Sequence, residues 1–272
     1  MQENDTESDS LKSLASSLVA EASTIDKALL DEITKAGVLY GRKRSKTNPR
    51  MRKYILTTRN DFEIFDVQKI LDLGQKAEDF LKSVAAKAGM FLVVGTEAAH
   101  KSAVKDFADR LGIPYVNNRW LGGTLTNFKT LSQRVQYYLK LKSDLETGRL
   151  DKYTKKERVQ FTKQSIRLDK LFSGLDKMTR LPQALIVVGS NSHITAVREA
   201  RKVKIPVIAI LSSDSDPDMV NFMFPGNDRS KSSITWILER FAKAIEAGYK
   251  EIIANPTPDT KTPPKASIAK HS

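Results

Sequence analysis

Short, uninterrupted apolar runs alternate with helical patterns from residue 90 onward, and this alternation constrains the fold more than any other feature of the chain. A run without interspersed polar residues is typical of a strand buried on both faces. Strands joined through helices form a parallel, doubly wound sheet with helices on both faces, so we predict an α/β fold. The predicted strands are 90–94, 115–116, 184–188, 207–211 and 222–224, and the predicted helices of this part are 98–111, 194–202 and 232–247.

The residues before this unit show a mixed pattern. Leucine and isoleucine residues at helical spacing predict a helix that stops near Gly37. Two short strands over 54–57 and 62–65 flank a turn of Arg, Asn and Asp. A longer helix over 67–88 then leads into the sheet.

Two long, charged helices over 129–146 and 154–172 separate the two halves of the sheet. A narrow apolar seam with charge elsewhere is typical of paired helices in a coiled coil. We therefore predict an antiparallel coiled-coil hairpin that is inserted into the α/β domain and protrudes from it. The predicted seam of the first helix is Leu131, Val135, Tyr138, Leu141 and Leu145, and that of the second is Val159, Ile166 and Leu168.

These elements divide the chain into four parts. The α/β domain spans 25–128 and 173–250, and the hairpin insertion spans 129–172. Residues 1–24 are rich in Ser and acidic residues, and residues 251–272 combine Pro with Lys and Thr. Such compositions bury too little apolar surface to fold, so we predict that both end segments are disordered.

The charge of the chain is strongly positive and unevenly distributed. Lys and Arg number 45 against 32 Asp and Glu, which gives a net charge of +13. Residues 1–32 hold eight acids and two bases, whereas residues 129–180 hold fourteen bases and six acids. A field of this sign attracts a polyanion, and nucleic acid is the commonest one in a cell. A membrane surface or an acidic protein would also satisfy this charge.

Catalytic and metal chemistry find little support in the sequence. The chain has no Cys, which excludes disulfides and thiolate chemistry, and its three His lack metal-ligand spacing. Residues 95–102 miss the phosphate-binding loop pattern because His100 replaces its last Gly, so we expect a plain strand-to-helix turn. Asp214, Asp216 and Asp218 begin like a calcium loop, but Met219 replaces the required Gly. We predict no catalytic residue, cofactor, metal or small-molecule substrate, and we expect His193 to start a helix.

Residues 42–53 are the strongest candidate for a binding site. Seven cations and no acid occur there, and Asn48 and Pro49 stiffen the segment. Cations without interspersed acids repel one another unless an anion offsets them, which favours phosphate contact. Further along, Arg119 could grip a phosphate, whereas we expect Trp120 to pack in the core.

Several motifs resemble those of the small-subunit ribosomal protein two family, of bacterial or organellar type. They include Gly41 and the Asn-Pro-Arg-Met of residues 48–51, and the highly specific Asn-Asn-Arg-Trp-Leu-Gly-Gly-Thr-Leu-Thr-Asn-Phe of residues 117–128. Leu-Pro at 181–182 and Phe-Pro-Gly-Asn-Asp at 224–228 follow in the right order. The resemblance covers residues 30–247 and implies a flavodoxin-like parallel sheet with an inserted coiled-coil hairpin.

The resemblance also implies a structural role in the small ribosomal subunit. Members of the family dock on small-subunit rRNA, contact neighbouring ribosomal proteins and help to bring small-subunit protein one to the mRNA path. Many members have His where Leu39 and Arg42 stand, so no metal site is carried over. The implied rRNA contacts are Arg42, Lys43, Arg44, Lys46, Asn48, Arg50, Arg52, Lys53, Arg119, Asn127, Lys129, Lys155, Lys156 and Arg158.

Two other classes of function compete with this interpretation. A nucleotide-binding α/β enzyme would use the carboxyl ends of the strands, but it needs an intact phosphate loop or a paired acid and base. A protein-docking module without direct RNA contact would use the hairpin and the acidic N-terminal extension, and it would leave the basic segment without a role. The acidic first residues fit neither a secretory signal nor a transit peptide, and no apolar stretch is long enough to span a bilayer. We therefore expect no membrane partner and a cytoplasmic ribosome in preference to an organellar one.

Overall fold

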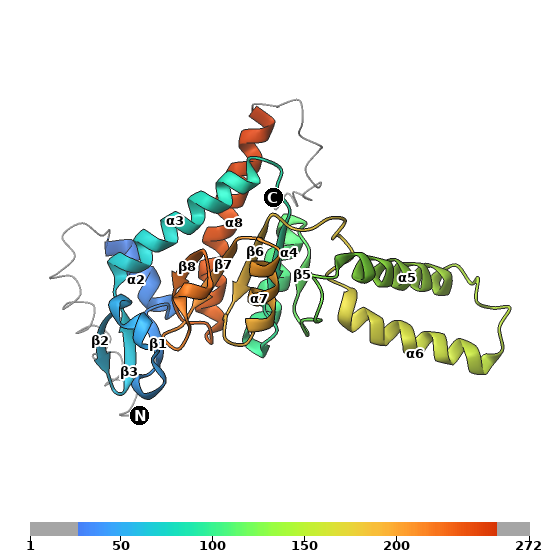
Figure 1. Cartoon of the computed structure of the whole chain (residues 1–272), viewed down its shortest axis with the longest axis horizontal. Coiled ribbons are helices and arrows are strands. Elements are labelled where there is room, and N and C mark those ends of the chain that lie inside the picture. Colours follow the sequence, from blue (N-terminus) through green and yellow to red (C-terminus); the bar gives the residue numbers. More distant parts are fainter. Residues whose placement is uncertain (1–26, 255–272) are drawn as a thin grey trace.

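The computed structural model describes residues 27–254, and a five-stranded parallel sheet forms their centre (Figure 1). The strand order is β5-β4-β6-β7-β8, which is the flavodoxin-like order. Every residue of β4, β6 and β7 is buried, and this explains why their sequences are continuous apolar runs. The strands are β4 (Phe91–Val94), β5 (Tyr115–Val116), β6 (Ala184–Val188), β7 (Val207–Leu211) and β8 (Phe222–Pro225).

Helices cover both faces of this sheet. Helices α3 and α4 both pack against α8, whereas α7 covers β7 on the other side (Figure 1). None of the helices within residues 27–254 combines the length and the apolar content needed to cross a membrane. The helices of the α/β domain are α2 (Lys27–Ala36), α3 (Val67–Ala85), α4 (Ala98–Leu111), α7 (Ile194–Lys202) and α8 (Lys231–Ala254).

Helix α8 is longer than the sequence pattern predicts, and it includes residues 251–254, for which the composition predicts a disordered tail. The burial of one side chain and an ion pair made by another explain the extension. Ile252 is buried, and Glu251 Oε1 lies 2.6 Å from Lys82 Nζ at the end of α3. The predicted disorder of residues 1–24 and of the tail beyond residue 254 falls outside the described residues.

A small antiparallel sheet of order β1-β3-β2 adjoins the main sheet (Figure 1, lower left). It is built from β1 (Tyr40–Lys43), β2 (Ile55–Arg59) and β3 (Phe62–Phe65), and two 3₁₀ turns, Arg44–Lys46 and Pro49–Tyr54, connect β1 to β2. The sequence pattern does not predict strand β1, because Tyr-Gly-Arg-Lys lacks apolar alternation. It forms because the edge of β3 supplies backbone partners for it.

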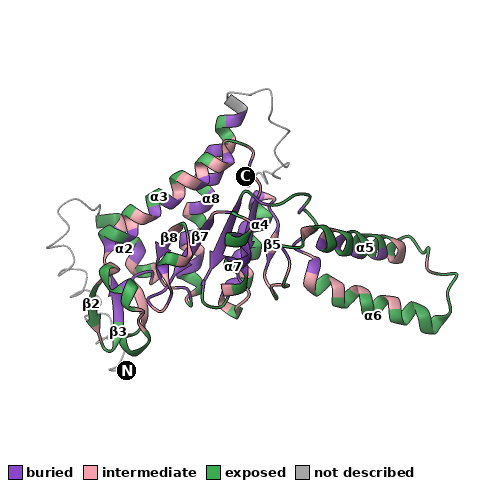
Figure 2. Cartoon of the chain, viewed as in Figure 1, coloured by how far each residue is buried: buried purple, intermediate pink, exposed green. Residues whose placement is uncertain are grey.

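The hairpin of α5 (Phe128–Glu146) and α6 (Lys155–Phe172) protrudes from the α/β domain, and most of its residues are exposed (Figures 1 and 2). Thr154 and Glu157 form a reciprocal capping box that starts α6. Tyr138 donates its hydroxyl to Asp169 Oδ1 at 2.5 Å and so ties the two helices together near their base. The predicted seam of α5 is confirmed at Leu131, Val135, Tyr138 and Leu141, which are buried, while Leu145 is half-buried.

The predicted seam of α6 is wrong at two of its three positions. Val159 is 47% exposed and Ile166 is 55% exposed, whereas Leu168 is half-buried. The true seam includes Phe161 and Leu168, with Phe172 buried at the base. Val159 and Ile166 each precede a seam residue by two positions, which is about 200° around a helix. They therefore lie on the opposite face.

Candidate nucleic-acid interface

The segment 42–53, called here the basic loop, lies against the carboxyl end of β7 and is held there by backbone contacts. Arg42 N donates to Ser213 Oγ and Asn48 N donates to Ser213 O, both at 2.8 Å. The Asn48 side chain accepts from Arg50 N and fixes the start of the second 3₁₀ turn. A Cβ on Gly41 would come within 2.9 Å of Ser213 Oγ, so only glycine permits this close approach.

Arg42 does not face solvent, as a phosphate contact would require, but anchors the basic loop. Its side chain is only 13% exposed, with Nη2 2.9 Å from Asp228 Oδ1 and Nε 3.5 Å from Asp214 Oδ2. A buried guanidinium is stable only where carboxylates offset it. The two aspartates therefore explain why a cation can occupy this position.

Arg50 is also paired, although it is more exposed than Arg42. Its Nη1 lies 2.7 Å from Asp216 Oδ2 and 3.1 Å from Asp218 Oδ2. The aspartates that resemble the start of a calcium loop thus balance the charge of the basic loop. Within residues 27–254 no cluster of three or more His, Cys, Asp or Glu could hold a metal ion.

The other five cations of the basic loop form one exposed, unneutralised group. None of them makes an ion pair with any residue that the structure describes. Two of them lie over aromatic rings: Lys43 Nζ is 5.9 Å from the centre of the Phe62 ring of β3, and Lys53 Nζ is 5.0 Å from that of Tyr54, which ends the second 3₁₀ turn. A rigid backbone that carries exposed cations can place them against successive phosphates. These cations are Lys43, Arg44, Lys46, Arg52 and Lys53.

A second candidate site lies in the loop 117–127, which wraps around the carboxylate of Glu199. Trp120 donates its indole Nε1–H to Glu199 Oε1 at 3.0 Å, and the backbone N–H groups of Gly123, Leu125 and Thr126 donate to the two carboxylate oxygens. Burial acts to raise the pKa of Glu199, but these hydrogen bonds outweigh it, and its pKa lies below the ordinary value. Trp120 is half-buried and packs against the core, which confirms packing as its role, although it lies at the margin of the core and not inside it.

No sequence motif singles out Glu199 as a functional residue. The available signal was a carboxylate on the otherwise apolar face of α7, beside the buried residues Ala196 and Ala200. The carboxylate of Glu199 fixes the loop, and Arg119 stays exposed on it. Asn127 and Lys129 are also exposed, at the point where α5 begins. All three flank the base of the hairpin.

The hairpin cations form a third group, which lies apart from the first. Lys155, Lys156 and Arg158 are exposed at the distal end of α6, and Arg158 Nη1 lies 3.0 Å from Asp151 Oδ1. The basic loop and this end of the hairpin lie at opposite ends of the long axis of the molecule (Figure 1). The cations of residues 42–53 therefore lie at one end of the molecule, and those of the hairpin lie at the other end and form a separate group.

The turn after β4 is a plain strand-to-helix connection, as predicted. Thr96 N donates to His193 Nε2 at 3.0 Å, so the proton of His193 sits on Nδ1 and bonds Gly189 O at 2.7 Å. His193 precedes the first residue of α7, which confirms its predicted position. His100 Nε2 lies 2.6 Å from Asp228 O, and the His100 ring is fully buried. Burial lowers the pKa of both histidines, so both are neutral near pH 7.

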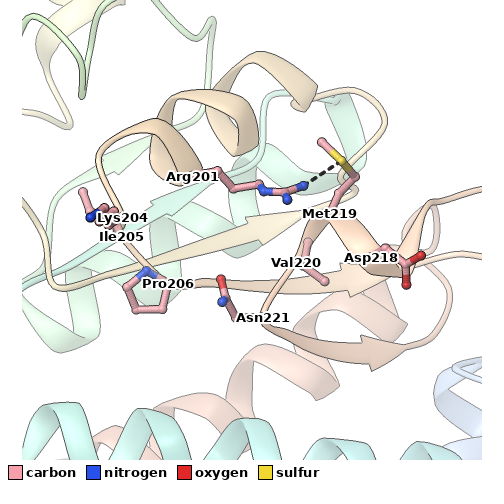
Figure 3. A pocket seen from close by; sticks show the side chains of 8 residues that line it. All are labelled: Arg201, Lys204, Ile205, Pro206, Asp218, Met219, Val220 and Asn221. Carbon is pink, nitrogen blue, oxygen red and sulfur yellow. Dashed lines mark hydrogen bonds between the residues drawn. The ribbon is translucent and has the colours of Figure 1, made fainter.

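A hollow of about 320 Å³ lies between the end of α7 and the segment that leads into β8 (Figure 3). Arg201 crosses it and its Nη1 contacts Met219 Sδ at 3.0 Å, while Lys204 and Asp218 stand at its margins. Asn221 Oδ1 accepts a hydrogen bond from Val207 N at 2.9 Å. Asp218, the one carboxylate among these lining residues, is paired with Arg50, which does not line the hollow.

Comparison with known proteins gives one consistent result. Residues 33–248 match the family model described as ribosomal protein S2. The small ribosomal subunit protein uS2 of Thermus thermophilus is 43% identical over 214 residues, which cover 79% of this chain and 84% of that protein. The protein of the same name from Corynebacterium diphtheriae is 40% identical over 220 residues, which cover 80% of this chain and 83% of that protein.

Proposed function

The chain belongs to the ribosomal protein S2 family, and we propose that its basic loop anchors it on small-subunit rRNA. It is a structural constituent of the small ribosomal subunit and not an enzyme. The five exposed cations Lys43, Arg44, Lys46, Arg52 and Lys53, none of them paired with a carboxylate within the described part of the chain, carry this proposal. Such cations release counterions from phosphates, and the α/β domain fixes where they stand.

The other predicted contacts have different parts in this proposal. Arg42 and Asn48 hold the loop in shape, and Arg50 shares its charge with two aspartates. Arg119, Asn127 and Lys129 form a second contact at the base of the hairpin, while Lys155, Lys156 and Arg158 form a third at its distal end. Contacts at both ends of an elongated molecule suit a protein that bridges separate segments of folded RNA.

Neighbouring ribosomal proteins are proposed as the partners of the outer face of the hairpin. Val159 and Ile166 expose apolar side chains there, and such exposure supports contact with protein more than with phosphate. We further propose that the chain helps to recruit small-subunit protein one. We also propose that its ribosome is cytoplasmic and not organellar. Mass spectrometry of particles that carry Val159→Ser and Ile166→Ser should show that a neighbouring protein is missing while the rRNA remains. Unchanged protein composition would contradict this assignment.

Sedimentation of a tagged copy through sucrose gradients tests the rRNA contact. The wild-type chain should travel with small subunits at low salt and dissociate as the salt concentration rises. A fourfold variant, Lys43→Gln, Arg44→Gln, Lys46→Gln and Arg52→Gln, should dissociate at a lower salt concentration. The slope of log K against log salt should fall by about 0.7 to 0.9 for each phosphate that the variant no longer neutralises.

The matched control removes the same charge from other surfaces, with Lys76→Gln, Lys87→Gln, Lys105→Gln and Lys202→Gln. These lysines are exposed and make no ion pair within residues 27–254. The control should keep most of the wild-type salt resistance. If both variants dissociated at the same lowered salt concentration, the contribution of the basic loop would be a general effect of charge and not of its position. Full retention by the loop variant would instead favour a protein-docking module without direct RNA contact.

A further inference from the structure

A cavity of about 350 Å³ opens between the basic loop and strand β2. Its volume lies within the range of sites that hold small molecules or single nucleotides, roughly 300 to 1,000 Å³. Arg44 and Arg52 of the basic loop border it, and Ile55 and Leu56 of β2 supply apolar surface. Three threonines and one carboxylate complete its lining, and they are Thr47, Thr57, Thr58 and Glu63.

Glu63 is the unusual member of this lining. It is only 5% exposed, yet it forms no ion pair with any described residue. Its Oε1 accepts from Thr47 Oγ1 at 3.2 Å and its Oε2 accepts from Thr58 Oγ1 at 2.7 Å. An ionised carboxylate offers about four lone-pair sites, so roughly two remain available for donors in the cavity. A buried carboxylate is costly unless such donors are provided.

Two cations stand at the mouth of the same cavity. Arg44 and Arg52 are exposed and make no ion pair within the described part of the chain. Neither arginine forms an ion pair with Glu63, so their guanidinium groups can bind an external anion. The cavity thus joins an acceptor pair in its interior to two anion-binding groups at its rim.

This combination selects among the bases of unpaired RNA. A carboxylate needs two adjacent N–H donors, and guanine presents them at N1 and N2 of its Watson–Crick edge. Adenine and cytosine each place an acceptor beside their amino group, and uracil flanks its single N–H with two carbonyls. Recognition of unpaired bases along this edge is the usual mode of sequence-specific RNA binding.

We propose that this cavity holds one unpaired guanine nucleotide of small-subunit rRNA. Glu63 accepts hydrogen bonds from N1–H and N2–H, and Arg44 and Arg52 contact the phosphates on either side of that nucleotide. The inference rests on the proposed function of the basic loop, and it adds base specificity to an interface that otherwise reads only phosphate and shape. Glu63 is then a specificity-determining residue.

The test uses the purified full-length chain and short single-stranded RNAs followed by fluorescence anisotropy. The RNAs are uridine heptamers with a central guanosine, inosine or adenosine. Inosine lacks the N2 amino group, so it should bind about tenfold more weakly than guanosine, and adenosine should bind more weakly still. Glu63→Gln should lower the affinity for the guanosine RNA to that for the adenosine RNA, while the salt dependence of binding, which comes from the cations, stays the same for all three RNAs.

The control variant is Asp61→Asn, which removes an acidic group two residues away that does not line the cavity. Asp61 has a φ of 65°, a conformation that Asn adopts readily, so the turn should be preserved. This variant should keep the preference for guanosine. Loss of the preference in both variants would assign the effect to general charge and overturn the role of Glu63.

Kethoxal, which reacts with the N1 and N2 edge of unpaired guanine, provides a second readout in assembled small subunits. One rRNA guanine should be protected with the wild-type chain and become several-fold more reactive with Glu63→Gln, while sedimentation with the particle is unchanged. Equal binding of the three heptamers would overturn the guanine site and leave the proposed function intact. Binding of free GMP as tightly as the guanosine heptamer would assign the cavity to a free nucleotide instead. Failure to bind any RNA or to sediment with the subunit would overturn the proposed function itself.

Discussion

The guanidinium of Arg42 contacts the carboxylate of Asp228, with 2.9 Å between Nη2 and Oδ1, although 186 positions separate the two residues in the chain. Asp228 follows β8 at the carboxyl end of the parallel sheet, and Arg42 lies in β1 of the small sheet. This pair therefore locks the basic loop onto the α/β domain. Arg42, the first residue of the basic loop, is therefore an internal anchor and not an exposed cation.

Removal of this anchor should cost more stability than removal of any exposed cation of the loop. Arg42→Met would leave Asp228 and Asp214 without their counter-charge, and we expect a decrease of about 3 to 5 kcal/mol in the free energy of unfolding. Urea denaturation measures it. The double variant with Asp228→Asn should recover a large part of this decrease, whereas Lys46→Met should change stability by less than about 0.5 kcal/mol. A decrease of similar size from both single variants would contradict the anchor.

The ionisation of Asp228 should make stability depend on pH. Burial, together with repulsion from Asp214 and Glu97, outweighs the attraction of Arg42 and raises the pKa of Asp228 to about 6. The folded state therefore holds this proton more tightly than the unfolded state, and the stabilisation is complete below the unfolded pKa near 3.8. Relative to Asp228→Asn, the wild-type chain should lose stability as the pH rises from about 4 to about 6. Above that range the difference should be constant, and a difference that is flat throughout would disprove the shift.

Glu199 should be essential to the loop that presents Arg119. Glu199→Gln keeps the size of the side chain but turns one oxygen into an amino group that faces backbone donors. We expect the free energy of unfolding to fall by about 1 to 3 kcal/mol, because buried N–H groups lose their acceptor. Thermal unfolding measures the melting temperature of Glu199→Gln beside that of the control Glu239→Gln, a change on an exposed face of α8. Equal melting temperatures for the two variants would show that the loop does not depend on this carboxylate.

The register of the hairpin can be tested with two neighbouring residues of α6. Leu168→Ala removes a half-buried seam residue and should destabilise the hairpin by about 1 to 2 kcal/mol, whereas Ile166→Ala removes an exposed side chain and should cost less than about 0.5 kcal/mol. Hydrogen exchange at the α5 and α6 amides measures the difference locally. A larger cost for Ile166→Ala than for Leu168→Ala would show that Ile166, and not Leu168, packs in the seam.

The hairpin should also be dispensable for folding of the α/β domain, which we propose to comprise 25–128 and 173–250. Replacement of residues 139–166 by a short Gly-Ser linker keeps the hairpin residues that pack on the core, which are Leu131, Val135, Tyr138, Leu168 and Phe172. The shortened chain should retain a single cooperative unfolding transition. An unfolded product would show that the hairpin is part of the folding unit.

The elements of the parallel sheet were predictable because local patterns specify them. The strands at 184–188 and 207–211 and the helices at 98–111 and 194–202 match the structure at both ends. In each case the apolar residues mark the buried surface directly. The seam of α6 was not predictable in this way, since Phe161 and the two exposed residues are all apolar and only their different burial in the folded hairpin distinguishes them.

The candidate site was predictable as a region but not in the roles of its residues. The sequence alone determined that residues 42–53 are a cationic segment beside an α/β core, because charge and hydrophobicity are properties of single residues and short windows. Only the tertiary structure decided that Arg42 is an anchor, that Glu199 organises the loop around Trp120, and that Glu63 lies in a cavity beneath two arginines. Each of those roles depends on a partner or a surface contributed by another element, and burial of a charge is fixed only once the chain has brought the two together.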